Sequence, residues 1–261
     1  MPDRRAIAKK LQGISPTPML DALFFLQCNP NPTEEEIDSF VKRRQAKEPV
    51  SKIVQQKGFW NLILKTTRDT LDPRPDSETL IETVLQYYPD RKLPLSILDV
   101  GTGTGCLLLA LLKCFLNSHG IGIDKSEKAL EVAKENGQGF KADFCLADFT
   151  NPTSLQVLKQ FDVIVSNPPY IPTKQISQLD ESVRLYDPLL ALDGGTDGLD
   201  AYRSLSKNLI SYLTKEGKLF LEIGCGQEDF VKDIFTSNNW NFLSSMSDLG
   251  GIVRVLVFQR K

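Results

Sequence analysis

The stretch Asp99-Val100-Gly101-Thr102-Gly103-Thr104-Gly105 decides the fold of this 261-residue chain. It begins within a short apolar run at 96–100 and precedes a longer one at 106–115, a pattern typical of a strand, a turn and a buried helix. Glycines let the backbone turn sharply and let a ligand approach it closely. The stretch therefore predicts a β-α unit with a ligand at its turn, whereas a tight turn without a ligand is the alternative interpretation.

The arrangement of the glycines and acids indicates the class of ligand. A nicotinamide dinucleotide site uses G-x-G-x-x-G to receive a pyrophosphate at a helix N-terminus. Here the glycines run G-x-G-x-G, an acid precedes them within the strand, and another acid ends the next predicted strand, 120–124, where a carboxylate can accept hydrogen bonds from ribose hydroxyls. This is the form seen in S-adenosylmethionine (SAM) sites, which bind no phosphate and must neutralise an amino group. We expect the cofactor to contact Asp99, Gly101, Thr102, Gly103, Thr104, Gly105 and Asp124.

Downstream of the glycine stretch, apolar runs and helical patterns alternate. We expect helices near 77–88, 126–136, 200–213 and 227–238, and strands near 142–147, 162–166, 217–223, 241–246 and 252–259. This alternation predicts an α/β fold with a doubly wound, mostly parallel, Rossmann-like sheet.

Upstream, residues 1–50 predict a small helical domain. Thr17 and Pro18 are typical of a helix start, and Thr33 with Glu36 matches a capping box. Residues 51–75 predict a connector, with a β-hairpin as one possible form, and they end in a proline-rich stretch that marks a domain boundary. The α/β domain then covers residues 76–261.

A second motif, Asn167-Pro168-Pro169-Tyr170, directly follows the predicted strand 162–166. Adjacent prolines lack backbone donors and stiffen the turn, but their carbonyls remain free to accept. Together with the Asn167 side-chain oxygen and the Tyr170 ring, the turn suits a planar –NH2 group, whose two N–H bonds need two acceptors. Doubly wound sheets bind ligands at the carboxyl ends of their strands, so we expect this motif beside the glycine turn. A structural strand–loop break is the alternative.

Composition argues against several classes of function. The chain has 31 Lys and Arg against 33 Asp and Glu, a net charge of −2, whereas proteins that bind duplex phosphate are usually basic.

His119 is the only histidine, so a histidine-rich metal site is impossible and no metal is expected. We expect this residue in a surface turn. The five cysteines, without C-x-x-C spacing, indicate free thiols. No segment predicts a membrane span or a signal peptide, and we expect a cytoplasmic protein. The basic residues at 41–47 are expected on a solvated helix face.

The two motifs together resemble those of SAM-dependent methyltransferases that modify exocyclic or amide nitrogens. More specifically, residues 40–260 resemble the release factor glutamine methyltransferases (the PrmC/HemK family) in the order and spacing of several blocks. These blocks are Arg43-Arg44, Glu48-Pro49-Val50, Phe59-Trp60, Thr70-Leu71-Asp72-Pro73-Arg74-Pro75-Asp76-Ser77-Glu78, Asn167-Pro168-Pro169-Tyr170-Ile171, Asp197-Gly198-Leu199-Asp200, Leu221-Glu222-Ile223-Gly224 and Asp248-Leu249-Gly250-Gly251-Ile252-Val253-Arg254-Val255.

The resemblance implies a seven-stranded sheet with an antiparallel last strand, and an N-terminal domain that docks the substrate. It implies methyl transfer from SAM to the side-chain amide nitrogen (N5) of the glutamine in the Gly-Gly-Gln motif of class I peptide-chain release factors, with no membrane and no direct nucleic acid as partner. The resemblance implies that Asn167, Pro168, Pro169 and Tyr170 are the catalytic and substrate-binding residues, and that Asn167 also contacts the cofactor. Those that it places at the adenine are Asp148 and Phe149.

The chain departs from the family pattern at a few positions. Asp72 stands where Ile is usual, Ser77 where Thr is usual, and Asp187 where Glu is usual, and the N-terminal module is about one helix shorter. Two other functions stay open: an adenine-N6 methyltransferase that flips a base of DNA or RNA, and a SAM-binding module without catalysis. The acidic balance counts against the first, and the intact Asn167 motif counts against the second.

Overall fold

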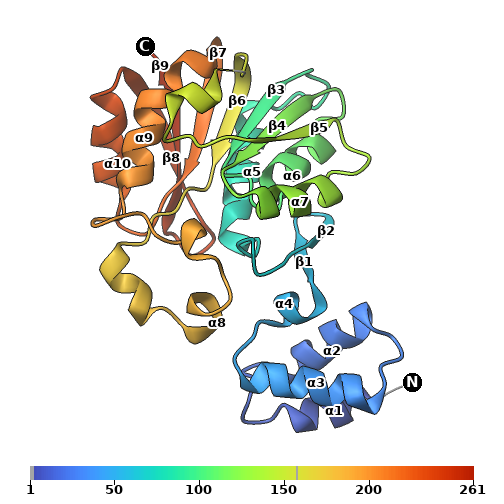
Figure 1. The fold of residues 1–261 in the computed structure, drawn as a ribbon. Coiled ribbons are helices and arrows are strands. Elements are labelled where there is room, and N and C mark those ends of the chain that lie inside the picture. The colour runs from blue at the N-terminus through green and yellow to red at the C-terminus, as the bar shows by residue number, and fades with distance from the viewer. Residues whose placement is uncertain (1–2, 157) are drawn as a thin grey trace.

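The computed structural model describes residues 3–156 and 158–261. Figure 1 shows two parts: a small group of helices at the N-terminal end, and an α/β domain whose central sheet has helices on both faces. A β-hairpin and a connecting segment lie between them. The predicted α/β fold with a doubly wound, mostly parallel sheet and an N-terminal helical part is confirmed.

The N-terminal part contains four helices: α1 (Arg4–Lys10), α2 (Pro18–Cys28), α3 (Glu34–Gln45) and α4 (Val50–Val54). Both predicted helix starts are confirmed, because α2 begins at Pro18 and α3 has a complete capping box between Thr33 and Glu36. Its core is built around Phe25 and Phe40, whose rings stack with their centroids 4.2 Å apart.

Some of the basic side chains at the end of α3 are less exposed to solvent than the sequence predicts. The Arg44 guanidinium lies 2.9 Å from Asp21 Oδ2 of α2, and only 11% and 10% of these two side chains are exposed. Arg43 pairs with the buried Glu48. The expectation is wrong for Arg44, because α3 packs this side chain against Asp21 of α2, whereas Lys42 and Lys47 are exposed as expected.

The connector forms a hairpin of β1 (Gln56–Phe59) and β2 (Leu62–Lys65). Its second strand is tied to the α/β domain, because the Lys65 backbone N–H donates to Asn136 Oδ1 at 2.7 Å and the Asn136 amide donates back to the Lys65 carbonyl at 3.0 Å. The hairpin is therefore attached at both ends, to α4 and to the sheet domain.

The main sheet has seven strands in the order β5-β4-β3-β6-β7-β9-β8. They are β3 (Ser96–Val100), β4 (His119–Asp124), β5 (Ala142–Leu146), β6 (Phe161–Ser166), β7 (Leu213–Glu222), β8 (Trp240–Ser247) and β9 (Val253–Arg260). The ladders from β5 to β7 are parallel, and β9 runs antiparallel to both of its neighbours, β7 and β8. Seven strands with an antiparallel last strand are thus confirmed.

Helices cover both faces of this sheet (Figure 1). They are α5 (Glu78–Tyr87), α6 (Cys106–Cys114), α7 (Glu127–Asn136), α9 (Asp200–Asn208) and α10 (Glu228–Thr236), with the short α8 (Glu181–Arg184) in a long loop. Side chains alternate along each strand, so neighbouring residues pack into different layers. Ile164 of β6 belongs to the core that contains α9 and α10, whereas Val163 and Val165 belong to the core that contains α5 and α6.

His119 is exposed, but it is the first residue of β4, paired in register with Ser96, rather than part of a turn. The prediction of a turn was wrong because the parallel ladder extends one residue further than the apolar pattern. All five cysteines are free thiols, as expected. In the described residues, no helix is long and apolar enough to cross a membrane.

The strand order reverses between β3 and β6, which is where doubly wound sheets form their binding crevice. The glycine stretch follows β3, and the Asn167 motif follows β6. Val100 and Ser166, the last residues of these strands, are partners in register, and the Ser166 hydroxyl donates to the Val100 carbonyl at 2.8 Å. The two motifs therefore begin side by side.

Candidate functional site

The glycine turn has the conformation that its sequence demands. Gly101, Gly103 and Gly105 have φ values of 74°, 55° and 83°, in the left-handed region that other residues rarely adopt. A Cβ atom at Gly101 or Gly103 would meet nothing within 4 Å, so these glycines serve the backbone path and leave open space beside it. The backbone N–H groups of Gly101 and Thr102 both donate to the Ile123 carbonyl at 2.9 Å, which holds the turn against β4.

Asp99 lies beneath this turn and is 1% exposed. Its Oδ2 accepts a hydrogen bond from the Thr102 hydroxyl at 2.7 Å, whereas its Oδ1 is buried without a partner. Burial raises the pKa of this carboxyl to about 7, because the charged form is poorly solvated there. An unpartnered buried carboxylate oxygen is unfavourable alone and becomes favourable beside a cation. Thr104, also in the turn, has a buried hydroxyl without a partner.

Asp124 ends β4 and faces the same turn. Its Oδ2 accepts from the Gly103 N–H at 3.0 Å, and its Oδ1 accepts from the Ser126 N–H at 2.9 Å, just before α7. Each carboxylate oxygen can accept more than one hydrogen bond, so these contacts orient the side chain and leave capacity for a ligand. The side chain is partly exposed.

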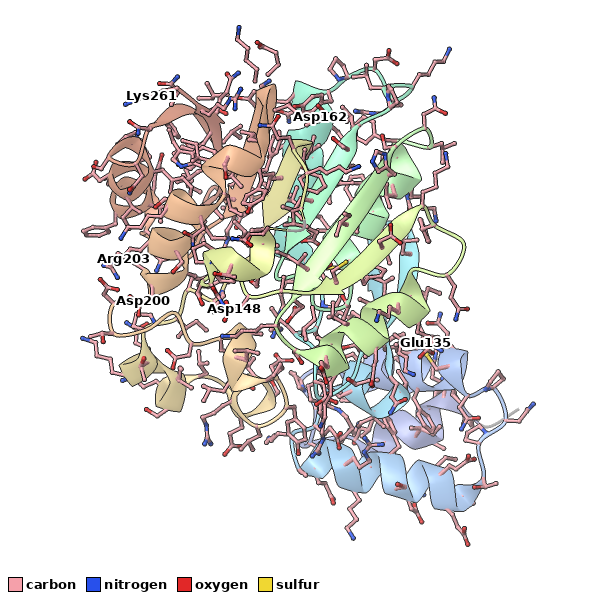
Figure 2. All side chains as sticks on the ribbon, turned by 45° about the horizontal axis from the view of Figure 1, so that its top comes forward. Glu135, Asp148, Asp162, Asp200, Arg203 and Lys261 are labelled. Carbon is pink, nitrogen blue, oxygen red and sulfur yellow. The ribbon has the colours of Figure 1, made fainter. Side chains whose placement is uncertain are left out.

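Asp148 and Phe149 follow β5 at the neighbouring position of the sheet. In Figure 2, Asp148 lies at the opposite end of the sheet from Asp162, which stands near the start of β6. Asp148 Oδ1 accepts from the backbone and hydroxyl of Thr150 at 2.8 and 2.7 Å, so that oxygen orders its own loop. Phe149 is partly buried against the core, and its carbonyl accepts from Asn208 at 2.8 Å.

The Asn167 motif is anchored at both of its ends. The Ile171 N–H donates to the Leu192 carbonyl at 3.0 Å, and Gly194 N–H donates to the Ile171 carbonyl at 2.9 Å. The Tyr170 carbonyl accepts from Gln227 at 3.0 Å. Asn167 is partly exposed, and its Nδ2 donates to the Ser77 hydroxyl at 3.1 Å. The loop is therefore fixed before any substrate binds.

A cavity of about 270 Å³ opens beside Asn167. Tyr170 and Arg254 line it, and Arg254 lies 2.8 Å from both Asp76 and Asp248. Burial raises the pKa of Tyr170 to about 12, so its hydroxyl remains protonated and neutral near pH 7. The cavity thus offers an amide, an aromatic ring and a firmly paired cation.

Glu222, the last residue of β7, also lines this cavity and is 2% exposed. Its Oε2 is buried without a hydrogen-bond partner. Burial raises the pKa of this carboxyl to about 7, although Ser77, Asn167 and the charge of Arg254 favour its charged form. Sequence reasoning did not assign Glu222 a role. The available signal was a lone acid at the end of an apolar strand, which is the position that Asp124 also occupies.

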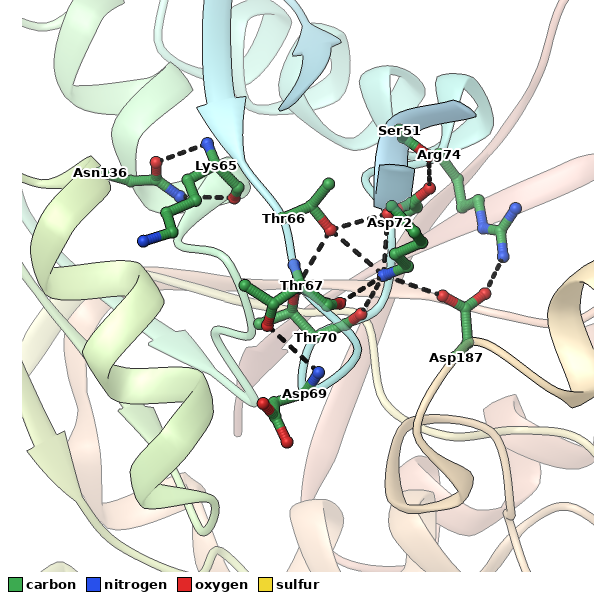
Figure 3. A network of polar contacts seen from close by, with 11 residues as sticks. Ser51, Lys65, Thr66, Thr67, Asp69, Thr70, Asp72, Arg74, Asn136 and Asp187 are labelled. Atoms are coloured by element: carbon green, nitrogen blue, oxygen red, sulfur yellow. Dashed lines mark hydrogen bonds and ion pairs between the residues drawn. The ribbon is translucent and has the colours of Figure 1, made fainter. Parts of the chain in front are cut away.

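A buried ionic network lies between the N-terminal part and this side of the site (Figure 3). The Lys52 side chain of α4 is 0% exposed, and its Nζ lies 2.9 Å from Asp72 Oδ1 and 3.2 Å from Asp187 Oδ1. It also donates to the carbonyls of Thr67 and Thr70 at 2.7 and 2.5 Å.

The network extends to the cavity beside Asn167, because Arg74, which lines that cavity, lies 2.6 Å from Asp187 Oδ2. Burial raises the pKa of Asp187. Burial also disfavours the charged form of Asp72, but the charge of Lys52 and the nearby hydroxyls have a larger combined effect and lower the pKa of Asp72. Asp72 and Asp187 are two of the positions where the chain departs from the family pattern, and here both share Lys52.

The structure therefore brings the predicted cofactor residues and the Asn167 motif to one end of one sheet. In the part of the chain that is described, no group of three or more His, Cys, Asp or Glu side chains could hold a metal ion. His119 starts its strand, whereas Asp124 ends it, so the histidine lies at the opposite end of β4 from the site.

Comparison with known proteins defines the class first. Residues 93–240 match the family model described as "Methyltransferase domain". The ribosomal protein L11 methylase of Lactobacillus delbrueckii subsp. bulgaricus has the same fold, with a TM-score of 0.52, 21% identity, and coverage of 73% of this chain and 83% of that chain. With a sheet of seven strands and a glycine turn after β3, the chain has a methyltransferase domain.

Curated relatives narrow the class to a family. The release factor glutamine methyltransferase of Thermodesulfovibrio yellowstonii is 39% identical over 251 residues, which cover 92% of this chain and 88% of the relative. That of Agrobacterium fabrum (strain C58) is 40% identical over 227 residues, which cover 86% of this chain and 78% of the relative. The chain belongs to the release factor glutamine methyltransferase family.

Proposed function

We propose that this protein transfers a methyl group from SAM to the side-chain amide nitrogen of the glutamine in the Gly-Gly-Gln motif of class I release factors. The observation that carries the proposal is the pairing of Val100 with Ser166, because it sets the glycine turn directly beside the Asn167 motif. The family supports the substrate, because its curated relatives bear the name of this reaction. We further propose that the enzyme works in the cytoplasm on protein, not on nucleic acid.

The residues around the glycine turn fit SAM. The unpartnered Oδ1 of Asp99 suits a cationic amino group, and the open space at Gly101 and Gly103 admits a ligand against the backbone. Asp124 is oriented to accept from ribose hydroxyls. Asp148 and Phe149 are assigned to the adenine, with Asp148 Oδ2 as the acceptor and the Phe149 ring against the base. Thr102, Thr104 and Gly105 complete the turn.

The residues at the other side of the crevice act on the glutamine. An amide nitrogen is a poor nucleophile because its lone pair is delocalised into the carbonyl. Asn167 Oδ1 and the Pro168 carbonyl would each accept one of its N–H bonds, which raises electron density on nitrogen and holds it in line. Pro169 stiffens the turn, and the Tyr170 ring packs on the amide plane. SAM supplies, when bound, a methyl group on a sulfonium that is already activated.

The geometry requires no strong general base, because the amide nitrogen becomes strongly acidic once it is methylated and can then lose its proton to water. Tyr170 is protonated near pH 7, since its pKa is raised to about 12 by burial. His119 lies at the far end of β4. We therefore assign the rate acceleration of methyl transfer to positioning of the substrate amide.

We also propose that residues 1–50 dock the release factor. A cavity of about 570 Å³ lies between α2 and the loop that carries α8. Leu20 of α2 and Val183 of α8 line it, and Val183 also lines the cavity beside Asn167. This shared wall supports a continuous path from the helical domain to the site of methylation.

The test uses purified protein, SAM and a recombinant class I release factor that lacks the modification. We expect one methyl group on the Gly-Gly-Gln glutamine, located by mass spectrometry of the digested release factor. Asn167→Ala should lower turnover by about 100-fold or more, since the amide loses an acceptor and its orientation. His119→Ala, an exposed change away from the site, is the control and should keep turnover.

Two outcomes would reject the proposal. Methylation of an adenine-containing oligonucleotide under the same conditions, with the release factor unmodified, would assign the adenine-N6 reaction instead. SAM binding by calorimetry without methylation of either substrate would leave a binding module without catalysis.

A further inference from the structure

The Asn167 side chain presents two chemically opposite ends at the substrate cavity. Its Oδ1 accepts hydrogen bonds and its Nδ2 donates them, and a half-turn of the amide group exchanges the two with little change in shape. A substrate –NH2 group needs an acceptor, so only one of the two orientations is productive. The structure must therefore contain something that selects it.

Ser77 is the direct partner of the amide but does not select an orientation by itself. Its hydroxyl accepts from Asn167 Nδ2 at 3.1 Å, and only 2% of the residue is exposed. A hydroxyl both accepts and donates, so it could equally donate to Oδ1 of a reversed amide. The selection depends on the group to which Ser77 gives its own hydrogen.

Glu222 is placed to be that group. Ser166 and Leu221 are partners in register, so Asn167 and Glu222 follow at neighbouring strand ends. Only 2% of Glu222 is exposed, and its Oε2 lacks a partner. Ser77 and Asn167 both stabilise the charged form of its carboxyl. An ionised carboxylate accepts and never donates. If Ser77 donates to it, the Ser77 oxygen is left to accept from Nδ2.

We propose that Glu222 and Ser77 are positioning residues, which act through this relay to turn Asn167 Oδ1 toward the substrate glutamine. This inference rests on the proposed function and adds which residues orient the acceptor, Asn167 Oδ1. Neither residue needs to touch the reacting atoms. The burial of a carboxylate with a free oxygen is unfavourable for folding, which is expected of a group retained for its role in the site.

The relay depends on the charge of Glu222, so it depends on pH. A protonated Glu222 carboxyl can donate a hydrogen bond to Ser77. The Ser77 hydroxyl can then donate to Asn167 Oδ1, and the Asn167 amide is no longer held with Oδ1 toward the substrate. The groups that act on this carboxyl are Arg254, which favours its charge, and Asp76, which opposes it. Tyr170 and Tyr202 also face it and stay neutral, because burial raises both of their pKa values. We expect kcat at saturating SAM to fall as the pH drops through about 7, the pKa of Glu222.

The experiment compares Glu222→Gln, Ser77→Ala and Ser77→Thr in the release factor assay. Gln donates as well as accepts, and Ala breaks the relay, so we expect each to lower kcat about tenfold or more while KM and SAM affinity change less than about threefold. Thr keeps the hydroxyl and should keep most of the activity. Glu216→Gln, an exposed change on the same strand, is the matched control.

The pH profile adds a readout that a merely structural role would not move. Glu222→Gln should flatten the acidic fall of kcat that the wild type shows. Wild-type kcat and an unchanged pH profile in Glu222→Gln would overturn the inference, as would a Ser77→Thr variant no better than Ser77→Ala. If Glu222→Gln does not fold, the two Ser77 variants decide. Failure of the proposed function is read separately, from a wild-type sample that leaves the glutamine unmodified.

Discussion

The proposed cofactor side and the proposed target side of this crevice each contain an almost fully buried carboxylate, Asp99 in β3 just before the glycine turn and Glu222 at the end of β7. Both have one oxygen without a partner, and burial raises both pKa values to about 7. They differ in where their neighbours come from. Asp99 is held by Thr102, three residues away, whereas Glu222 depends on residues from distant parts of the chain. The carboxylate of the cofactor side is therefore held by a residue close in sequence, whereas that of the target side is held by distant segments.

This difference teaches which parts of the site are robust. The glycine turn should survive a disturbance elsewhere, because it is held by the neighbouring strand β4, through the Ile123 carbonyl and the Asp124 carboxylate. The target side relies on Arg74 and Asp187, which the buried Lys52 joins to the helical domain. Damage far from the reaction should therefore affect the target side first.

The largest expected effect comes from Lys52→Met. Removal of the cation leaves Asp72 and Asp187 buried beside each other, and loss of one member of a buried ionic network destabilises a protein by about 3–5 kcal/mol. We expect a lower free energy of unfolding and a higher KM for the release factor, while SAM affinity stays within about twofold at a temperature where the sheet domain is folded. Thermal unfolding, kinetics and calorimetry measure the three quantities.

Lys207→Met, an exposed change on α9, is the control for this variant. A parallel loss of SAM affinity in Lys52→Met, in protein that is still folded, would contradict the separation of the two sides.

The next effect is expected at Asp99, on the cofactor side. Asp99→Asn removes a charge-assisted contact to the amino group, typically 1.5–3 kcal/mol, so SAM affinity should fall by about 10- to 100-fold. Because the pKa of Asp99 is about 7, wild-type affinity should weaken as the pH drops from 8 to 6, since the neutral acid no longer pairs with a cation. Calorimetry across pH measures both effects.

The pH dependence should be lost in Asp99→Asn, whereas Asp229→Asn, on the exposed face of α10, should behave as wild type. An affinity that does not vary with pH in the wild type would show that Asp99 does not pair with the amino group.

A smaller effect is expected at Asp124. Asp124→Ala removes one or two hydrogen bonds to the ribose, each worth about 1 kcal/mol, which predicts a loss of SAM affinity of roughly 5- to 30-fold. Asp143→Ala, an exposed change on β5, is the control. Unchanged affinity in Asp124→Ala would mean that this carboxylate only orders the turn through Gly103 and Ser126.

Errors in the sequence interpretation have physical causes. The basic end of α3 was expected in solvent because charge patterning on one helix does not reveal that Asp21 of another helix will meet Arg44. Likewise, Lys52 carried no signal, since a lysine is more often exposed than buried. Its partners lie 20 and 135 positions away along the chain.

The sequence by itself determined the sheet, the glycine turn and the Asn167 motif. Each is encoded by short-range patterns: alternation of apolar runs, glycines where φ must be positive, and two adjacent prolines after a strand. Right-handed crossovers leave few possible strand orders for such a series. The tertiary structure alone decided that Glu222 lies beside Asn167 and that Asp72 and Asp187 share Lys52. Those contacts depend on ladder register and on packing between segments far apart in the chain, which no local pattern records.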